Sequence, residues 1–134
     1  MASDNMFSPV DVAISGMRAQ NQNISAIYSN VANARTTDAG DGQPYRRVEA
    51  IFRAQDEELG GVEIQELAED QSDFRYISIP GHPDANEEGL VAMPNVDIPT
   101  EMINLNIATR AYQANAALLK RYQAAVDAAL ELLR

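Results

Sequence analysis

The chain has 134 residues and a net charge of -10, with 46% hydrophobic but only 6% aromatic residues. This composition excludes disorder throughout and argues against a thick globular core, while the acidic charge disfavours nucleic acid and anionic lipid as partners. The chain has no cysteine, which excludes thiol catalysis, disulfides and cysteine-ligated metals. It shows no 18-residue apolar run and no basic-then-apolar leader, so we expect neither membrane insertion nor a cleaved signal peptide.

The N-terminal region predicts an amphipathic helix from about residue 9 to Asn33. Ser8-Pro9-Val10-Asp11 resembles a capping box with proline at the first helical position. A heptad register has Val10, Met17, Ile24 and Val31 at one core position and Ala13, Gln20, Ile27 and Ala34 at the other. The opposite side is polar or small, with Ser15, Gly16, Arg18, Ala19 and Asn23. We therefore expect the helix to need one neighbour, a C-terminal helix running antiparallel to it.

The middle of the chain predicts a small β module that leans on a helix. A loop is expected at residues 38–43, strands at Tyr45–Phe52, Val62–Glu66 and Phe74–Ile79, a turn at 56–61, and a loop at Pro80–Asn95. Residues 49–101 hold fourteen acids against Arg53 and Arg75, so the acidity lies in the middle. The nearly neutral, apolar terminal helices suit close packing against copies or relatives.

The last segment, Asp97–Arg134, predicts one helix roughly 50 Å long, with Asp97 as N-cap and Pro99 in the first turn. One apolar stripe contains Leu105, Ala108, Tyr112, Ala116, Leu119, Tyr122, Val126, either Ala129 or Leu130, and Leu133. A second stripe contains Ile103, Ile107, Ala111, Ala114, Leu118, Ala125, Ala128 and Leu132 and lies nearly back to back with the first. One neighbour cannot cover both stripes, so the second predicts a partner molecule.

The remaining motifs do not indicate an enzyme. His82 has no evident nucleophile or acid beside it and favours a turn. Asp84–Gly89 has the oxygen spacing of the first half of a calcium loop, but Asn95 stands where a bidentate glutamate is needed; a calcium-regulated binding protein stays an alternative. Tyr45–Arg47 favours a salt-bridge seam with a neighbour's acidic middle, and Glu66–Asp73 a solvated face. We predict no catalytic residue, no cofactor and no metal site.

A resemblance to a known family sharpens this interpretation. The stretch Ser29-Asn30-Val31-Ala32-Asn33-Ala34-Arg35-Thr36-Thr37 resembles the signature that closes the N-terminal helix of bacterial flagellar rod and hook proteins. Similarity to the proximal rod proteins of that family extends over Pro44–Arg47, Pro80–Gly89, Met93–Val96, Glu101–Ile103 and Arg110–Asn115, and covers nearly the whole chain. The departures are mild: Leu90 stands where tyrosine is common, and Asp56–Asp73 is unusually acidic.

The resemblance implies a mainly α fold, an antiparallel coiled coil of long N- and C-terminal helices (1–37 and 97–134) with an outward-facing loop and β module (38–96) between them. It implies a structural subunit of the bacterial flagellar basal-body proximal rod in the periplasm, exported through the type III apparatus without a cleaved signal peptide. Such a subunit self-associates in a helical tube that transmits torque and encloses the export channel. The implied partners are other proximal rod subunits, distal rod subunits and the rod-to-membrane-ring adaptor.

The predicted assembly contacts follow from the two apolar helices. They are Ile24, Ile27, Val31, Ile103, Ile107, Tyr112, Leu118, Leu119 and Val126, with Asn30 and Asn33 expected to shape the turn out of the first helix. A secreted helical-hairpin adaptor or chaperone of a secretion system, which needs one partner and no tube, is the main alternative.

Overall fold

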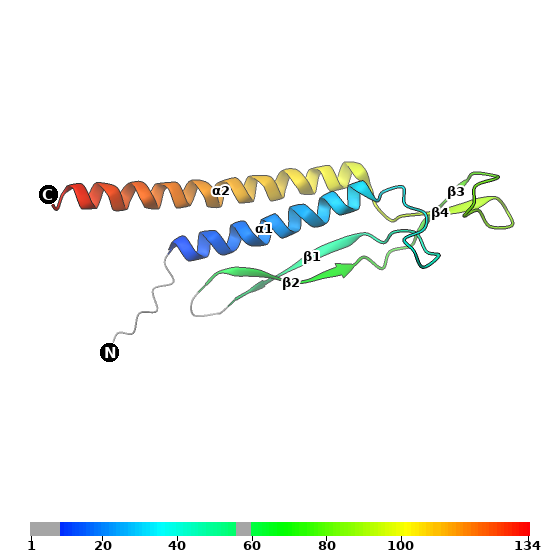
Figure 1. The fold of residues 1–134 in the computed structure, drawn as a ribbon, viewed down its shortest axis with the longest axis horizontal. Coiled ribbons are helices and arrows are strands. Elements are labelled where there is room, and N and C mark those ends of the chain that lie inside the picture. The colour runs from blue at the N-terminus through cyan, green and yellow to red at the C-terminus, as the bar shows by residue number, and fades with distance from the viewer. Residues whose placement is uncertain (1–8, 56–59) are drawn as a thin grey trace.

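The computed structural model describes residues 9–55 and 60–134. In chain order they form α1 (Pro9–Ala32), β1 (Val48–Ala54), β2 (Val62–Glu69), β3 (Arg75–Ser78), β4 (Leu90–Met93) and α2 (Ile98–Glu131). The fold is mainly helical with a small β component, as predicted. Figure 1 shows an elongated molecule in which the β1–β2 hairpin runs beside the helices and the β3–β4 hairpin lies at one end. Ser8 and residues 56–59, which belong to the predicted capping box and turn, lie outside the described residues.

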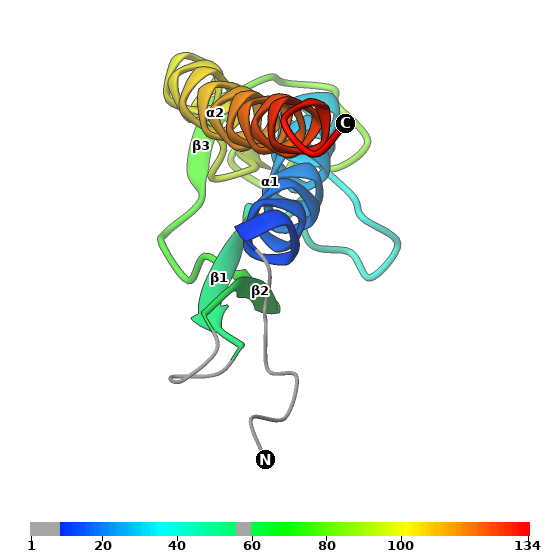
Figure 2. The ribbon, with the colours of Figure 1, turned by 90° about the vertical axis from the view of Figure 1, so that its left-hand side faces the viewer.

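The helices and the longer hairpin form three layers, with α1 in the middle. Figure 2, viewed along the helices, shows α2 on one side of α1 and the β1–β2 hairpin on the other. The helices run antiparallel, because Asn30 meets Glu101 and Gly16 meets Asn115. The two residue numbers add to 131 at both contacts, so the first residue of α1 lies level with Tyr122. Beyond that level, the C-terminal end of α2 projects past α1 (Figure 1).

Helix α2 begins where its sequence predicts. The Asp97 carboxylate accepts hydrogen bonds from the Thr100 hydroxyl (2.5 Å) and the Thr100 backbone N–H (3.1 Å), and these bonds lower the pKa of Asp97 below its ordinary value. Pro99 lies in the first turn, where backbone N–H groups have no intrahelical acceptor, so the N–H that proline lacks costs little. The predicted N-cap and the long C-terminal helix are therefore confirmed.

Helix α1 is confirmed over nearly its predicted length, and besides its main predicted neighbour, α2, it has a second one in the β1–β2 hairpin. Ser15, Gly16 and Ala19, expected on its polar or small side, are buried. Gly16 faces α2, whereas the Ser15 hydroxyl donates to the Val12 carbonyl (2.7 Å) and accepts from the Val62 N–H in β2 (3.1 Å). Small side chains here allow a second layer to approach, so α1 is covered by both α2 and the β1–β2 hairpin.

The heptad pattern of α1 accounts for its packing only in part. Among the eight predicted core positions, Ala13 and Ile27 are buried and the other six are half-buried. The antiparallel helix pair is present, and coiled-coil geometry stays a prediction.

The strands form two separate two-stranded antiparallel sheets rather than one module of three strands. In the described residues β1 pairs with β2, with a bulge between Ile51 and Phe52, and β3 pairs with β4. Strand β4 lies in a stretch predicted as loop, so that prediction is wrong at Leu90–Met93. Four apolar residues between turns carry too little periodicity to indicate a strand. In the structure the Val91 side chain is 0% exposed, so this short strand packs against the rest of the chain.

Gly16 marks a close approach of the two helices. A Cβ atom added there would lie 2.7 Å from Nδ2 of Asn115, whose amide also donates to the Ala111 carbonyl (3.0 Å). We expect Gly16→Ala to lower the free energy of unfolding by about 1–2 kcal/mol, because Asn115 must leave a hydrogen-bonded position.

The control repeats Gly16→Ala in a chain that also carries Asn115→Ala, which removes the clashing amide. There the higher helix propensity of alanine should make Gly16→Ala stabilising by about 0.5–1 kcal/mol. Urea denaturation of the four chains measures both effects, and the same sign in both backgrounds would contradict the close contact.

Candidate assembly surface and the polar junction that supports it

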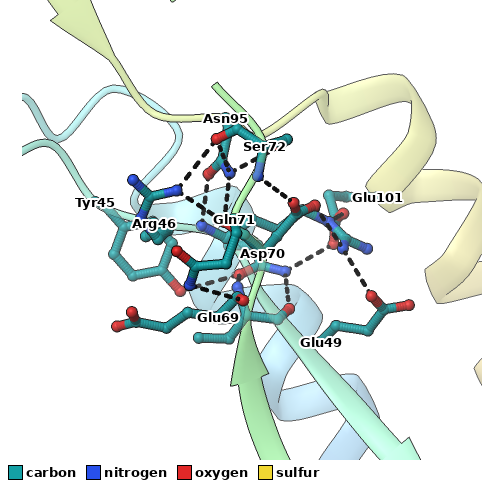
Figure 3. A network of polar contacts seen from close by, with 12 residues as sticks. Tyr45, Arg46, Glu49, Glu69, Asp70, Gln71, Ser72, Asn95 and Glu101 are labelled. Carbon is teal, nitrogen blue, oxygen red and sulfur yellow. Dashed lines mark hydrogen bonds and ion pairs between the residues drawn. The ribbon is translucent and has the colours of Figure 1, made fainter. Parts of the chain in front are cut away.

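A network of polar side chains joins the end of α1, the start of β1 and the first turn of α2. This network, called here the polar junction, is shown from close by in Figure 3. It comprises Asn30, Tyr45, Arg46, Arg47, Asp70, Ser72, Asn95 and Glu101. Among the described residues, no buried side-chain nitrogen or oxygen lacks a hydrogen-bond partner.

Asn30 is the fully buried centre of the junction, with 0% exposure. Its Oδ1 accepts hydrogen bonds from the Val48 N–H (2.9 Å) and the Tyr45 hydroxyl (3.0 Å). Its Nδ2 donates to the Val48 carbonyl (2.8 Å) and to Glu101 Oε2 (3.0 Å). The amide thereby satisfies both backbone groups of Val48 where α1 meets the sheet. Strand β1 begins at Val48 rather than at the predicted Tyr45, and before it the backbone N–H groups of Tyr45 and Arg47 donate to the Thr36 carbonyl (2.9 Å) and to Asn95 Oδ1 (2.8 Å).

Glu101 is a carboxylate buried completely in the first turn of α2. Its side chain is 0% exposed, and its Oε1 accepts from Nε of Arg47 at 2.5 Å. The Arg47 side chain is 16% exposed and also lies near Asp70 (3.5 Å) and Glu49 (3.6 Å). Burial alone would lower the pKa of the Arg47 guanidinium, but the hydrogen bond and charge of Glu101 outweigh burial and raise that pKa above its ordinary value. The Arg47 guanidinium therefore stays charged although both side chains of the pair are largely removed from solvent.

Asn95 ties the segment before α2 to the segment after β2. Its Oδ1 accepts from the Arg47 backbone N–H (2.8 Å), and its Nδ2 donates to the Asp70 carbonyl (2.9 Å) and to Oγ of Ser72 (3.0 Å). Hydrogen bonds from Ser72, with a smaller contribution from Arg47, lower the pKa of the Asp70 carboxyl. Two segments far apart in the sequence are thus fixed side by side (Figure 3).

The guanidinium groups of Arg46 and Arg47 both bind partners within their own chain. Arg46 donates to the carbonyls of Asp70 (3.0 Å) and Ser72 (3.1 Å), and its guanidinium lies 4.2 Å from the centroid of the Phe74 ring. The sequence favoured a seam in which these arginines pair with a neighbour's acids; the structure instead engages both guanidinium groups within the chain.

Sequence reasoning missed Glu101 and Asn95 as members of this junction. From the sequence alone, Glu101 indicates only a favourable negative charge near the positive end of the helix. The missed signal is its position: Glu101 precedes Leu105 and Ala108 by four and seven residues, so it belongs to the face of α2 that packs on α1. No comparable signal marks Asn95.

The turn after α1 is held by the asparagine-threonine signature. Asn33 Nδ2 donates to the Ser29 carbonyl (2.9 Å), and the Thr36 hydroxyl and backbone N–H donate to Asn33 Oδ1 (3.1 Å) and its carbonyl (3.0 Å). Thr37 then donates to Asp84 Oδ2 (2.6 Å), which links this turn to the β3–β4 hairpin.

A second side of α2, next to the face that packs on α1, carries exposed apolar residues. This outer flank consists of Ile103, Ile107, Arg110, Ala114, Leu118, Arg121 and Ala125, which share one face at helical spacing. Ile103, Ile107 and Leu118 are 61%, 62% and 50% exposed, whereas Ala108 on the α1 side is 2% exposed. Arg110 and Arg121 interrupt the apolar residues of this row, and exposed isoleucine and leucine side chains gathered on one face are a usual mark of an interaction surface.

The outer flank continues onto the hairpin. Beside Ile107 a hollow of about 160 Å³ is lined by Asn23, Ala50 and the 40% exposed Phe52, together with other residues of α1 and β1. The candidate assembly surface therefore includes the outer flank of α2 and the adjoining edges of α1 and β1.

The predicted contact residues divide into three groups in the structure. Ile27 and Asn30 are buried inside the chain, Ile24, Val31, Asn33 and Leu119 are half-buried, and Ile103, Ile107, Tyr112, Leu118 and Val126 are exposed. Ile27 and Asn30 thus belong to the packing that positions the surface, and the third group is available for direct contact.

The motifs weighed for other chemistry serve local structure. His82 lies in a turn, where its Nδ1 accepts from the Asp84 N–H (3.1 Å). Asn86 Oδ1 accepts from the backbone N–H groups of Glu88 (3.0 Å) and Leu90 (2.9 Å), as in a turn closed by its own side chain. Within residues 9–55 and 60–134, no group of three histidine or acidic side chains is placed to hold a metal ion.

Neither described helix carries an apolar stretch long enough to cross a bilayer. Terminal helices packed antiparallel, a β-rich insertion and an unpartnered apolar flank define a structural protein that works by assembly. Residues 87–132 match the family described as "Flagellar basal body rod FlgEFG protein C-terminal". That match covers β4 and all of α2.

Whole-chain comparisons agree. The chain is 40% identical to flagellar basal-body rod protein FlgC of Yersinia enterocolitica, over 81% of this chain and 84% of the relative. It is 33% identical to the FlgC proteins of Agrobacterium fabrum (98% of this chain, 97% of the relative) and Bacillus subtilis (94% and 97%). The chain belongs to the FlgC family of flagellar basal-body rod proteins. It is a structural rod subunit and not an enzyme.

Proposed function

We propose that this chain forms part of the proximal rod, where its helices pack with those of neighbouring subunits into a tube around the export channel. The observation that carries the proposal is the outer flank of α2, where Ile103 is 61% exposed and Ile107 is 62% exposed. Burying such a side chain contributes about 1.5–3 kcal/mol. A row of them on each subunit supplies a continuous helix–helix contact.

The function is mechanical, because a rod must transmit torque without changing shape. The polar junction supports this role, since Asn30, Arg47 and Glu101 hold the helix pair and hairpin in one arrangement. We further propose coiled-coil packing of the terminal helices in the assembled tube, where neighbouring helices complete the half-buried heptad positions.

The proposed partners are other proximal rod subunits, distal rod subunits and the adaptor between rod and membrane ring. The proposed place is the periplasmic rod of the basal body, reached through the flagellar export apparatus without removal of a signal peptide. Family membership supports these partners and this place.

The alternative, a secreted helical-hairpin adaptor or chaperone, would need only one partner for the outer flank. A defined 1:1 complex with one secreted protein would support it, whereas open-ended, concentration-dependent association with rod subunits supports the rod.

Ile107→Asp tests the proposal in a strain that lacks the native protein. We expect the variant to be secreted and folded but to give no complete rods and no swimming, because a carboxylate would be buried in the helix–helix contact. The matched control is Ile77→Asp on β3, where isoleucine is 46% exposed but lies off the flank. Swimming in soft agar and images of isolated basal bodies give the readouts; normal motility of Ile107→Asp would contradict burial of this flank.

A further inference from the structure

The C-terminal end of α2 is a projecting apolar tail. Residues 122–133, called here the tail, lie at or beyond the level of the first residue of α1 (Figure 1). Helix α1 covers the same face of α2 further along, but it extends only to the level of Tyr122. Val126, Leu130 and Leu133 are 40%, 58% and 84% exposed. Within the described residues, the tail therefore presents an apolar face that α1 does not cover.

The tail and the outer flank carry charges of opposite sign. The tail contains two acids, Asp127 and Glu131, and no base, and the free carbonyl groups at the end of a helix add partial negative charge. One negative charge stays in excess when Arg134, which follows the tail, is counted. The part of α2 from residue 102 to residue 121 has no acid and three bases, Arg110, Lys120 and Arg121. None of these bases forms an ion pair with another described residue.

The tail and the outer flank cannot meet within one molecule, because both lie on one continuous helix. Helix α2 runs without a break from Ile98 to Glu131. Val126 lies 19 residues beyond Ile107, which is roughly 28 Å along the helix axis. A tail that covers an outer flank must therefore come from a second molecule. Opposite charges on two apolar faces favour such an association in one orientation.

The residue spacing shows how the two faces match. The outer flank has residues at positions 103, 107, 110 and 114, and the tail has residues at positions 122, 126, 129 and 133. Both series advance by four, three and four residues, the spacing at which parallel helices pack side by side. A shift of 19 residues between two parallel helices places Tyr122 against Ile103 and Val126 against Ile107. A shift smaller by one heptad would leave both isoleucines uncovered.

The same shift also brings the opposite charges together. Arg110 of the outer flank then faces the small Ala129 of the tail, which leaves room for the guanidinium. Asp127 lies two residues before Ala129, about 3 Å along the helix axis, and on the side of the contact toward which Arg110 extends. An arginine in an apolar contact needs such an acceptor, because an unpaired buried charge is costly.

From these surfaces we infer that the tail of one copy packs in parallel on the outer flank of a second copy, with Val126 against Ile107 and Asp127 beside Arg110. The inference rests on the proposed function and names the surface that covers the outer flank. Tail and flank are different surfaces, so each docked pair leaves one free tail and one free flank. A head-to-tail contact of this type builds an open row and not a closed dimer.

Exchanging two charges tests the contact in a strain that lacks the native protein. Arg110→Asp alone and Asp127→Arg alone should each reduce swimming in soft agar and the amount of the chain in isolated basal bodies. The chain with both changes should restore both readouts, because the pair is then formed with reversed signs. The control combines Asp127→Arg with Lys120→Asp, which lies off the outer flank and should restore neither. Absence of restoration in the exchanged pair, or equal restoration in the control, would overturn the docking.

Engineered cysteines test the shift of 19 residues, because the chain has no cysteine of its own. In the Ile107→Cys/Val126→Cys chain, mild oxidation of isolated basal bodies should give disulfide-linked dimers and higher multimers. The control is Leu118→Cys/Val126→Cys. Leu118 is 50% exposed on the same flank but lies 11 residues, or roughly 16 Å, from Ile107. A disulfide requires Cα atoms within about 7 Å, so this control should give no multimers. Should Ile107→Cys abolish motility, the Ile103→Cys/Tyr122→Cys pair replaces it.

The proposed function and the docking fail in different ways. Absence of the unmodified chain from isolated basal bodies would overturn the proposed function itself. If the chain is present, missing multimers in the Ile107 pair or equal multimers in the Leu118 control would overturn only the docking. Dimers from Ile107→Cys alone or from Val126→Cys alone would also overturn it, because they would place two like surfaces together.

Discussion

Replacing Glu101 by alanine should lower the free energy of unfolding by about 3–5 kcal/mol, because breaking a buried ion pair leaves an uncompensated charge. The Glu101 side chain is 0% exposed and that of its partner Arg47 is 16% exposed. Little water can therefore reach the guanidinium to replace the hydrogen bond that the carboxylate accepts. The change also removes an acceptor from the buried Asn30 amide. Asp70 and Glu49, at 3.5 and 3.6 Å from Arg47, retain part of its charge interaction and keep the effect within this range.

The matched variant is Glu101→Gln, which keeps the shape and one acceptor oxygen but removes the charge. We expect it to lose about 1–3 kcal/mol, less than alanine, since an acceptor for Arg47 or Asn30 remains. Urea denaturation followed by circular dichroism measures both variants. A loss below about 1 kcal/mol in Glu101→Ala would contradict the buried pair.

Asn30→Ala should be the second severe change, with a loss of about 3–4 kcal/mol. It leaves the N–H and carbonyl of Val48 and an oxygen of Glu101 without their partner, and each buried polar group left unpaired costs about 1–3 kcal/mol. Asn33→Ala is the control from the same signature, because half-buried Asn33 makes one bond to the Ser29 carbonyl and accepts one from Thr36. We expect its loss to be about 1 kcal/mol.

The double variant of Asn30 and Glu101 adds a further check. Their 3.0 Å hydrogen bond couples the two sites, so the combined loss should be smaller than the sum of the single losses. If the two losses instead add up, the two side chains stabilise the fold independently. That result would contradict their membership of one coupled network.

The sequence predicted the helices well because their signals are local. Asp97 caps α2 as expected, and α1 ends within one residue of Asn33. The outer flank was also visible, since Ile103 and Ile107 fall on one face by spacing alone. These features need no knowledge of what lies elsewhere in the chain.

The polar junction and the layer order were not predictable in the same way. Whether Glu101 is a surface charge or a buried ion pair depends on Arg47, 54 residues earlier in the chain. Likewise, the sequence alone indicates that Ser15 and Ala19 face solvent, whereas in the structure both are buried and Ser15 bonds to β2. Strand β3 was predicted within Phe74–Ile79, but its partner β4 is a run of only four apolar residues, which is too short to be recognised as a strand from the sequence.

The helix pair joins opposite ends of the sequence, and this has a consequence for when the protein can fold. Asn30 and Glu101 are 71 positions apart, and Gly16 meets Asn115 near the other end of the pair. Contacts between such distant residues carry a large loop-closure entropy and slow the folding step that forms them. A chain threaded through a narrow conduit keeps its two ends apart, whichever end leads. Such a chain can form its helix pair only after it has left the conduit. It would therefore pass through unfolded and fold at the site of assembly.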